Sequence, residues 1–414
     1  MRTKPFAAAA VAAGGALIVA SCGGGGRAAD AVGGCDPGIT DTSIKIGSSS
    51  MQSGPAAAWK AMPQSSLAYF DEINEAGGVT MGDGKKRTIE FVSVDDAYDP
   101  ARAVKNTKKL VEQDKIFGVF QGAGTTPTLA ILDYTTSAGV PILFPMTGSV
   151  EFEPKVADGA LLANAMLPQT SWENRILLDS IAAANPQAKI GILYPNDGLG
   201  KTGLEQMTSM VEGTDMEIVA SESYEQSAAT VDSQVVNLKS SGADVFVSFA
   251  TGSFVTQSLK KAAEIDWTPA KYIISSSTDT ESFLKPAGAE ATDDLHSVAW
   301  LYDVSNPAND DRPGMKKWRE FAERNSDQVN GKNAIAAAGY NNAQLLVATL
   351  EQVDGCERAD LLDAAQGLTG VSTDLAVEGV GFGGGSAEYP YGITSMATMS
   401  FEDGQWVYGD VVTR

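Results

Sequence analysis

The stretch VFQGAGTTPTLAILDYTTSAGVPILFPMTGS, residues 119–149, has the pattern of a strand, a helix and a second strand separated by polar loops. Thr126 is a typical helix N-cap, Pro127 suits the first helical position and Gly139 suits the position after the last turn. A short apolar run follows at 140–144. We therefore expect a βαβ unit in a parallel sheet.

Glycine and hydroxyl residues directly follow both predicted strands, at 121–126 and at 145–149. In a parallel sheet, the loops after neighbouring strands share one edge, where helix N-termini present free backbone N–H groups. Such an edge can bind a small anionic group, for example a carboxylate. The alternative is that both loops are ordinary tight turns.

The composition is that of a soluble globular protein with room for two domains. The chain has 414 residues, of which 43% are hydrophobic and 20% are charged. The formal net charge of -22 argues against nucleic acid as a partner, because phosphate binding needs basic patches. The acidity also fits the solvated surface of an exported protein.

The first 22 residues read as a lipoprotein signal peptide. A positively charged start is followed by a short apolar run at 6–20, and the small residues VAS precede Cys22. Cys22 is the expected lipidation site, and residues 23–42 form a tether of small and polar residues. A plain secretory peptide is the alternative. Both interpretations place the mature protein outside the cytoplasm, and lipidation would anchor it to the cell membrane.

Cysteine and histidine are scarce in the rest of the chain. Cys35 and Cys356 are the two cysteines left after Cys22, and in an oxidising compartment they are a candidate disulfide. Two free buried thiols are the alternative. His296 is the one histidine, so nothing has metal-ligand spacing and we expect no metal and no cofactor.

The strand and helix pattern forms two series. The first begins with SIKIGS at 43–48, and the second begins with KIGILY at 189–194 after a pause near 163–171. A mixed segment follows, and an Asp-Gly pair at 403–404 between two apolar runs predicts a terminal β-hairpin. Two lobes of like architecture explain this order more simply than one long sheet. The predicted fold class is α/β, with two doubly wound parallel sheets.

Segments spread over nearly the whole mature chain resemble the leucine/isoleucine/valine-binding family of type I periplasmic binding proteins, the receptors of ABC importers. The resemblance rests on the order and spacing of these segments, since no single one is diagnostic: YFDEINEAGGV, VDDAYDPARAV, KLVEQDKIFGVFQG, GVPILFP, AKIGILYPNDGLGKTG, VDSQVVNLKSSGADVF and GYNNAQLL. The family implies two lobes joined by three crossovers around a ligand cleft. We expect residues 43–165 plus 300–390 in lobe 1, and 166–299 plus 391–414 in lobe 2.

The resemblance also implies ligand-binding positions in lobe 1. Thr125 matches the hydroxyl residue that takes a ligand carboxylate, with backbone groups of Gly124 and Thr126 nearby. Trp59 matches an aromatic wall residue, although it could be a simple core aromatic, as Thr125 could be a simple helix cap. The second loop is matched by Thr147, Gly148 and Ser149, where glycine replaces the usual hydroxyl residue.

Lobe 2 departs from the family pattern at three expected ligand positions. Leu199 and Thr251 stand where aromatic residues are common, and Ser277 stands where an acidic residue binds the α-amino group of branched-chain amino acids. Asp279 and Glu281 lie close enough in sequence to replace that acid. These changes support a carboxylate site in lobe 1 more strongly than an amino-group site in lobe 2.

The sequence therefore predicts a monomeric solute-binding lipoprotein of an ABC importer, with permease subunits as partners and a small amino acid, of branched-chain type by family, as ligand. Amides, urea or aromatic acids are alternative ligands, and a ligand-sensing receptor is an alternative role. An enzyme is not expected, because a hydrolase would need a base beside a nucleophile and the chain has one histidine and no Gly-x-Ser-x-Gly elbow.

Overall fold

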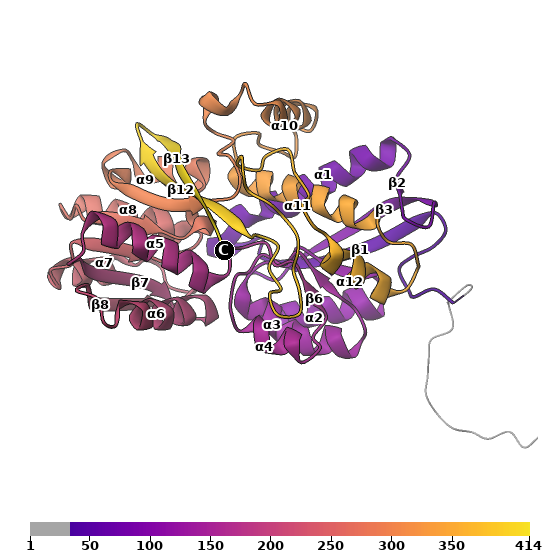
Figure 1. Cartoon of the computed structure of the whole chain (residues 1–414), viewed down its shortest axis with the longest axis horizontal. Helices are drawn as coiled ribbons and strands as arrows, with labels where there is room; N and C mark the ends of the chain where they lie inside the picture. Colours follow the sequence, from indigo (N-terminus) through magenta and orange to yellow (C-terminus); the bar gives the residue numbers. More distant parts are fainter. Residues whose placement is uncertain (1–33) are drawn as a thin grey trace, which may run out of the picture.

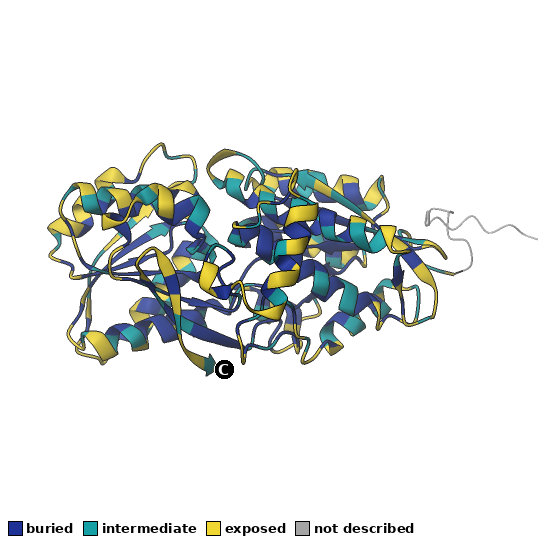
Figure 2. Cartoon of the chain, turned by 90° about the horizontal axis from the view of Figure 1, so that it is seen from above, coloured by how far each residue is buried: buried dark blue, intermediate teal, exposed yellow. Residues whose placement is uncertain are grey.

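Two separate β-sheets organise the chain in the computed structural model, which describes residues 34–414 (Figure 1). Each sheet is covered by helices on both faces, and the strands form the buried centre of each half (Figure 2). We call the half with the six-stranded sheet lobe 1 and the half with the seven-stranded sheet lobe 2. The predicted signal peptide and Cys22 lie outside the described residues.

The lobe 1 sheet has the strand order β2-β3-β1-β4-β5-β6 and is parallel except at the β2–β3 edge. Its first strand buries Ile44 and Ile46 completely, which is why the alternating run predicted a strand there. The six strands are β1 (Ser43–Ser50), β2 (Val79–Thr80), β3 (Lys86–Asp95), β4 (Gly118–Phe120), β5 (Ile142–Leu143) and β6 (Leu162–Ala163).

Helices cover both faces of the lobe 1 sheet. On one face α1 packs against α11, with α12 beside it, and on the other face α2 packs against α3. A 3-10 helix, η1 (Gly54–Lys60), precedes α1, and α4 follows β5. The α-helices of this lobe are α1 (Ala61–Glu75), α2 (Pro100–Glu112), α3 (Thr125–Ser137), α4 (Phe152–Ala157), α10 (Pro313–Arg324), α11 (Ala334–Leu350) and α12 (Arg358–Gly367).

The lobe 2 sheet has the order β13-β12-β11-β10-β9-β7-β8, parallel from β8 to β11 and antiparallel at β12 and β13. The Asp-Gly turn of the terminal hairpin is confirmed, because Asp403 and Gly404 both have positive φ. The strands are β7 (Lys189–Pro195), β8 (Glu217–Tyr224), β9 (Val245–Ser248), β10 (Ala270–Ile273), β11 (Leu295–Ala299), β12 (Ser395–Glu402) and β13 (Gln405–Thr413).

The main helices of lobe 2 form one pair on each side of its sheet, α5 with α6 and α7 with α8 (Figure 1). They are α5 (Thr170–Ala184), α6 (Gly198–Val211), α7 (Asp232–Ser240) and α8 (Ser253–Glu264). Short helical turns follow β10 and β11, namely η2 (Ser275–Ser277), η3 (Thr280–Leu284), α9 (Lys285–Ala287), η4 (Glu290–Thr292) and η5 (Pro307–Asn309). Among residues 34–414, no helix has the length and apolarity that crossing a bilayer requires.

The chain passes between the lobes three times: between β6 and α5, after β11, and between α12 and β12. These crossovers hydrogen-bond to one another. Ala165 of the first crossover donates to the Pro390 carbonyl of the third crossover and accepts from its Gly392 N–H. Leu301 of the second crossover forms an antiparallel bridge with Ala376 of the third. The predicted fold, two doubly wound sheets joined by three crossovers, is confirmed.

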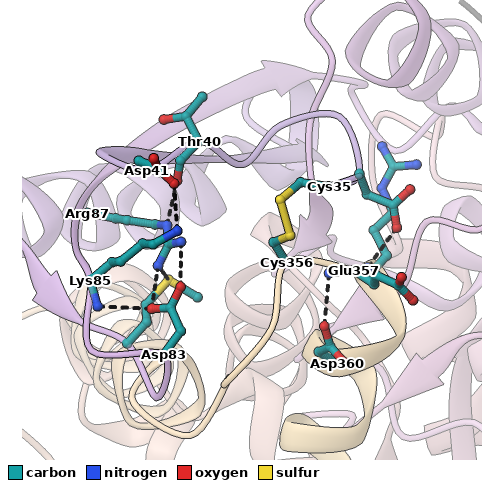
Figure 3. Close-up of a disulfide and its surroundings, with 12 residues drawn as sticks. Cys35, Thr40, Asp41, Asp83, Lys85, Arg87, Cys356, Glu357 and Asp360 are labelled. Carbon is teal, nitrogen blue, oxygen red and sulfur yellow. Dashed lines mark hydrogen bonds and ion pairs between the residues drawn. A yellow bond between two sulfur atoms is a disulfide. The ribbon is translucent and has the colours of Figure 1, made fainter. Parts of the chain in front are cut away.

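Cys35 and Cys356 form a disulfide that joins the start of the described chain to the loop before α12 (Figure 3). The Asp36 N–H also donates to the Cys356 carbonyl over 3.0 Å. Nearby, the buried Arg87 guanidinium donates to both Asp83 carboxylate oxygens and to the Thr40 carbonyl (Figure 3). The segment predicted as a tether is therefore fixed to lobe 1 from Cys35 onward.

Candidate functional site

The loops after β4 and β5 meet at the carboxyl edge of the lobe 1 sheet. The Oγ1 atoms of Thr125 and Thr147 lie 2.9 Å apart and share a hydrogen bond, and both residues are buried. Thr125 and Thr126 are the first two residues of α3, so their N–H groups have no partner inside the helix. The two loops thus place hydroxyl groups and a helix N-terminus together, as the sequence pattern predicts.

Gly124, and not Thr126, is the N-cap of α3, so the predicted cap is wrong by two residues. Gly124 has φ 99, and a Cβ atom there would lie 2.4 Å from Tyr98 Cε2, so only glycine fits under the tyrosine ring. Its N–H donates to the Met146 carbonyl over 3.1 Å. This N–H, one of the backbone groups expected near a ligand, is therefore engaged within lobe 1, whereas Gly139 follows the helix with positive φ as predicted.

Lobe 2 closes directly over these loops. A Cβ atom at Gly198, the first residue of α6, would lie 3.2 Å from Thr125 Cγ2 and 3.2 Å from Glu151 Oε1. The Tyr98 hydroxyl donates to Asp197 Oδ2 across the cleft over 3.0 Å. Desolvation of the hydroxyl and the neighbouring Asp197 carboxylate raise the pKa of Tyr98, so the hydroxyl keeps its proton and remains a donor.

The first and third crossovers contact the loop after β5. A Cβ atom at Gly148 would lie 1.8 Å from the Pro168 carbonyl oxygen, so the first crossover passes against the backbone here. The Gly148 carbonyl accepts from the Thr170 N–H and hydroxyl, both over 2.7 Å. Tyr391 of the third crossover donates to the Ser149 carbonyl over 2.8 Å. Gly148 and Ser149 therefore link the loop after β5 to the first and third crossovers.

The three expected lobe 2 residues follow strands β7, β9 and β10, at the carboxyl edge of their sheet. Leu199 is half-buried against the apolar core, and the Thr251 N–H donates to the Tyr224 hydroxyl over 3.2 Å. Ser277 is fully buried and donates to the Ala250 carbonyl over 2.6 Å. Its hydroxyl is used inside lobe 2.

A cavity of 80 Å³ lies between the lobes, beside the second crossover. Trp59 is the expected site residue that lines it. The rest of its wall comes from the loop after β5, the first crossover, the loop after β10, β11 with the second crossover, the first turns of α11, and the terminal hairpin: Met146, Leu167, Ser275, Ser276, Thr278, Asp279, Val298, Ala299, Trp300, Leu301, Tyr302, Asp303, Ala334, Ile335, Ala337, Ala338, Met399, Trp406 and Tyr408.

Asp279 joins the two lobes at this cavity. One of its carboxylate oxygens accepts from the Ser282 N–H over 2.5 Å, and the other accepts from the N–H groups of Ala334 and Ile335 over 2.5 and 3.3 Å. A lobe 2 side chain thus supplies acceptors to the first turn of α11 in lobe 1. Burial raises the pKa of Asp279, and the backbone donors act in the opposite direction. The other suggested acid, Glu281, pairs with Lys285.

The family described as periplasmic binding protein matches residues 43–401, most of the chain. The chain belongs to the periplasmic binding protein family. This is a family of solute-binding proteins and not of enzymes, and its location is outside the cytoplasm.

Known relatives of this periplasmic binding protein are distant in sequence and near in fold. A Leu/Ile/Val-binding protein homolog 7 from Brucella abortus (strain 2308) is 23% identical over 359 residues, 84% of this chain and 86% of the relative. A branched chain amino acid ABC transporter from Thermus thermophilus, solved with bound valine, has a TM-score of 0.78 at 16% identity and covers 90% of this chain and 97% of that one. A fatty acid ABC transporter substrate-binding protein from Thermomonospora curvata has a TM-score of 0.76 at 18% identity, covering 92% and 95%.

Sequence reasoning missed most of the cavity wall of this periplasmic binding protein. Trp300 and Trp406 come from the second crossover and the terminal hairpin, and Ile335 from the start of α11. No short motif links these segments, because they meet only when both lobes are folded. The Ser277 hydroxyl is bonded to the Ala250 carbonyl, whereas Ser276 and Thr278 on either side line the cavity.

Proposed function

We propose that this periplasmic binding protein is the solute-binding lipoprotein of an ABC importer, and that it holds a small carboxylate-bearing solute between its lobes. The observation that supports this proposal is the meeting of the Thr125–Thr147 pair and the α3 N-terminus with α6 of lobe 2. Helix N-termini and hydroxyl groups favour an anionic group. Closure of the second lobe would then remove the ligand from water.

A ligand can close the two lobes only if its affinities for the closed and open forms differ. A ligand stabilises the closed arrangement only to the extent that it binds this form more tightly than the open form. The interactions that span the lobes, such as Tyr98 with Asp197 and Asp279 with α11, are made only when the lobes are together. The closed form would then dock on the permease, with surface carboxylates of the acidic chain meeting basic permease residues.

The carboxylate site is tested by thermal shift and calorimetry on the mature chain with a panel of amino acids and small organic acids. A ligand at 100 times its dissociation constant should stabilise the protein by about 2.7 kcal/mol. Thr125→Ala should weaken the best ligand about tenfold or more, because a hydrogen bond to a charged group is lost. Thr208→Ala, on the exposed face of α6, is the matched control. Unchanged affinity of Thr125→Ala would contradict the carboxylate site.

The lipid anchor is tested separately. Wild-type protein should partition into the detergent phase when membranes are separated with a nonionic detergent, and Cys22→Ser should stay in the aqueous phase. Detergent partitioning of the Cys22→Ser protein would contradict the proposed lipidation site.

A further inference from the structure

Aromatic side chains form much of the wall of the cavity between the lobes. They come from η1, the second crossover and the terminal hairpin: Trp59, Trp300, Tyr302, Trp406 and Tyr408. The faces of such rings carry negative electrostatic potential and attract organic cations, most strongly where water is excluded. An aromatic wall therefore suits an ammonium group as well as an apolar one.

Two buried carboxylates also line this cavity, and both keep acceptor capacity. Asp279 accepts from three backbone N–H groups, as described above. Asp303 accepts from the Thr280 hydroxyl over 3.0 Å and from the Ser305 N–H over 2.7 Å. A carboxylate has about four lone-pair sites, so these neutral donors leave at least one free on each group. The wall can therefore accept further hydrogen bonds from a ligand.

No cation of the described chain balances these charges inside the cavity, because none of the lining residues is a lysine, an arginine or a histidine. The exposed Arg312 stacks on the Tyr302 ring, with its Cζ atom 3.8 Å from the ring centroid. Its Nε donates to Asn309 Oδ1 over 3.3 Å. A buried charge without a counter-charge is strongly unfavourable, so a cationic ligand would stabilise the closed arrangement here.

The Trp59 indole N–H adds an unused donor to the same wall. Trp59 is 4% exposed, and its Nε1 atom has no hydrogen-bond partner among the described residues. The Trp406 indole, by contrast, donates to the Thr278 carbonyl over 3.0 Å. A buried donor without an acceptor is costly, so a ligand that brings an acceptor oxygen to Trp59 gains the full hydrogen bond.

We propose that this cavity binds an organic ammonium compound, with its nitrogen beside Asp279 and Asp303 and an acceptor oxygen bonded to the Trp59 N–H. The cavity wall alone supports this proposal, which needs no contact to Thr125 and so goes beyond the proposed carboxylate site. The cavity volume of 80 Å³ is smaller than the roughly 150 Å³ that holds benzene in an engineered protein core. A primary ammonium group, with three N–H donors for the carboxylates, therefore fits better than a bulky trimethylammonium group.

The test compares pairs of compounds in which a carbon atom replaces the nitrogen. Calorimetry on the mature chain uses ethanolamine against propan-1-ol, choline against 3,3-dimethylbutan-1-ol, leucine against 2,4-dimethylpentanoate, and glycine betaine against 3,3-dimethylbutanoate. We expect the nitrogen compound to bind at least about tenfold tighter in the best pair, which should be one with a primary ammonium group. Equal or tighter binding of the carbon analogue in every pair overturns the proposal.

The same pairs separate this proposal from the carboxylate site at Thr125. If ethanolamine or choline binds and the carboxylates do not, the ammonium site is supported and the proposed carboxylate site fails. If the carboxylates bind without preference for the nitrogen, the carboxylate site stands and the ammonium site fails. If none of these compounds binds, both fail.

Asp303→Asn tests the charge of the cavity wall. The amide keeps an oxygen for the Ser305 N–H, and the loss of charge should weaken the best nitrogen compound about tenfold without changing the affinity of its carbon analogue. Asp311→Asn is the matched control, because it removes one charge from an exposed position before α10 in the same segment. A merely structural role of Asp303 would weaken both members of the pair alike. An equal loss for both, or no loss, would overturn the proposal.

The Trp59 donor is tested with the same nitrogen compound. Trp59→Phe keeps an aromatic wall and removes the N–H, and it should weaken binding about tenfold. Trp267→Phe is the matched control, since that indole donates to the Ala243 carbonyl over 3.1 Å inside lobe 2. Unchanged affinity of Trp59→Phe, with the control also unchanged, would overturn the role of Trp59 as a ligand donor.

Discussion

Asp96 is a fully buried carboxyl group directly after β3, close to Tyr98, which bonds to the other lobe. It accepts from the Ser49 hydroxyl and from the Tyr98 N–H, both over 2.9 Å. Burial raises the pKa of Asp96 to about 6, although these donors act in the opposite direction. The folded protein therefore holds a proton on this group at pH values where the unfolded chain has already lost it.

The raised pKa of Asp96 predicts a pH dependence of stability. Between about pH 4 and pH 6 the folded state binds more protons than the unfolded state, so this group's contribution to the free energy of unfolding falls as pH rises. Relative to Asp96→Asn, the wild type should lose up to about 3 kcal/mol over that window. Urea unfolding at a series of pH values measures the difference. Asp158→Asn, at an exposed loop, is the control, and parallel profiles for wild type and Asp96→Asn would contradict the assignment.

At the residue scale, the sequence indicated those parts of the site that depend on local patterns. The loops with Thr125 and Thr147 follow adjacent parallel strands, so their meeting follows from the βαβ pattern. The predicted N-cap of α3 was wrong because the helix begins after Gly124, where the Tyr98 ring from another loop leaves no room for a side chain. The hydrogen bonds between the Asp279 carboxylate and the start of α11 could not be predicted either, because the donors Ala334 and Ile335 are distant in sequence.

At the element scale, long periodic segments were the most predictable. The helix α11 (Ala334–Leu350) carries a strong sequence signal, because Asn333 caps it and a long apolar face defines it. The two-residue strands β2 and β6 were missed, since two residues carry no periodicity. The helix α6 begins at Gly198, because the Asp197 side chain accepts from the Gly200 N–H and caps it there.

The disulfide is the covalent link between elements that are far apart in sequence. It closes a loop with a sequence separation of 321 residues, so replacing both cysteines by serine should lower the free energy of unfolding by about 4 kcal/mol or more in the chain-entropy model. Denaturant unfolding of Cys35→Ser/Cys356→Ser against wild type measures this loss. Reducing agent should destabilise the wild type and leave the double variant unchanged. Equal unfolding midpoints for the two oxidised proteins would contradict the expectation.

At the scale of the whole molecule, the closed arrangement depends on the absence of a side chain at position 198. Gly198→Val would place methyl groups against Thr125 and Glu151 of the other lobe, and should hold the lobes apart. Since the closed form would then be less populated, ligand affinity should fall about tenfold or more. Calorimetry measures the affinity, and small-angle scattering measures the expected increase in radius of gyration.

The matched control for this variant is Gly367→Val, because a Cβ atom at Gly367 meets nothing within 4 Å. That substitution should leave both affinity and radius of gyration unchanged. If Gly198→Val binds ligand as the wild type does, the contact between α6 and the lobe 1 loops is not needed for closure.

The two-lobe architecture follows from the order of strands and helices, whereas the contacts between the lobes do not. Each lobe is a series of local βα units, but the cavity wall and the paired crossovers combine segments from both ends of the chain. Such contacts carry no sequence periodicity.

The most direct test of the proposed function is a crystal structure of the mature protein with the best-binding ligand of the panel. We expect ligand density between the lobes, with the carboxylate at Thr125 and the α3 N-terminus. Ligand density on the surface of a single lobe, or in the cleft without contact to the loops after β4 and β5, would contradict it.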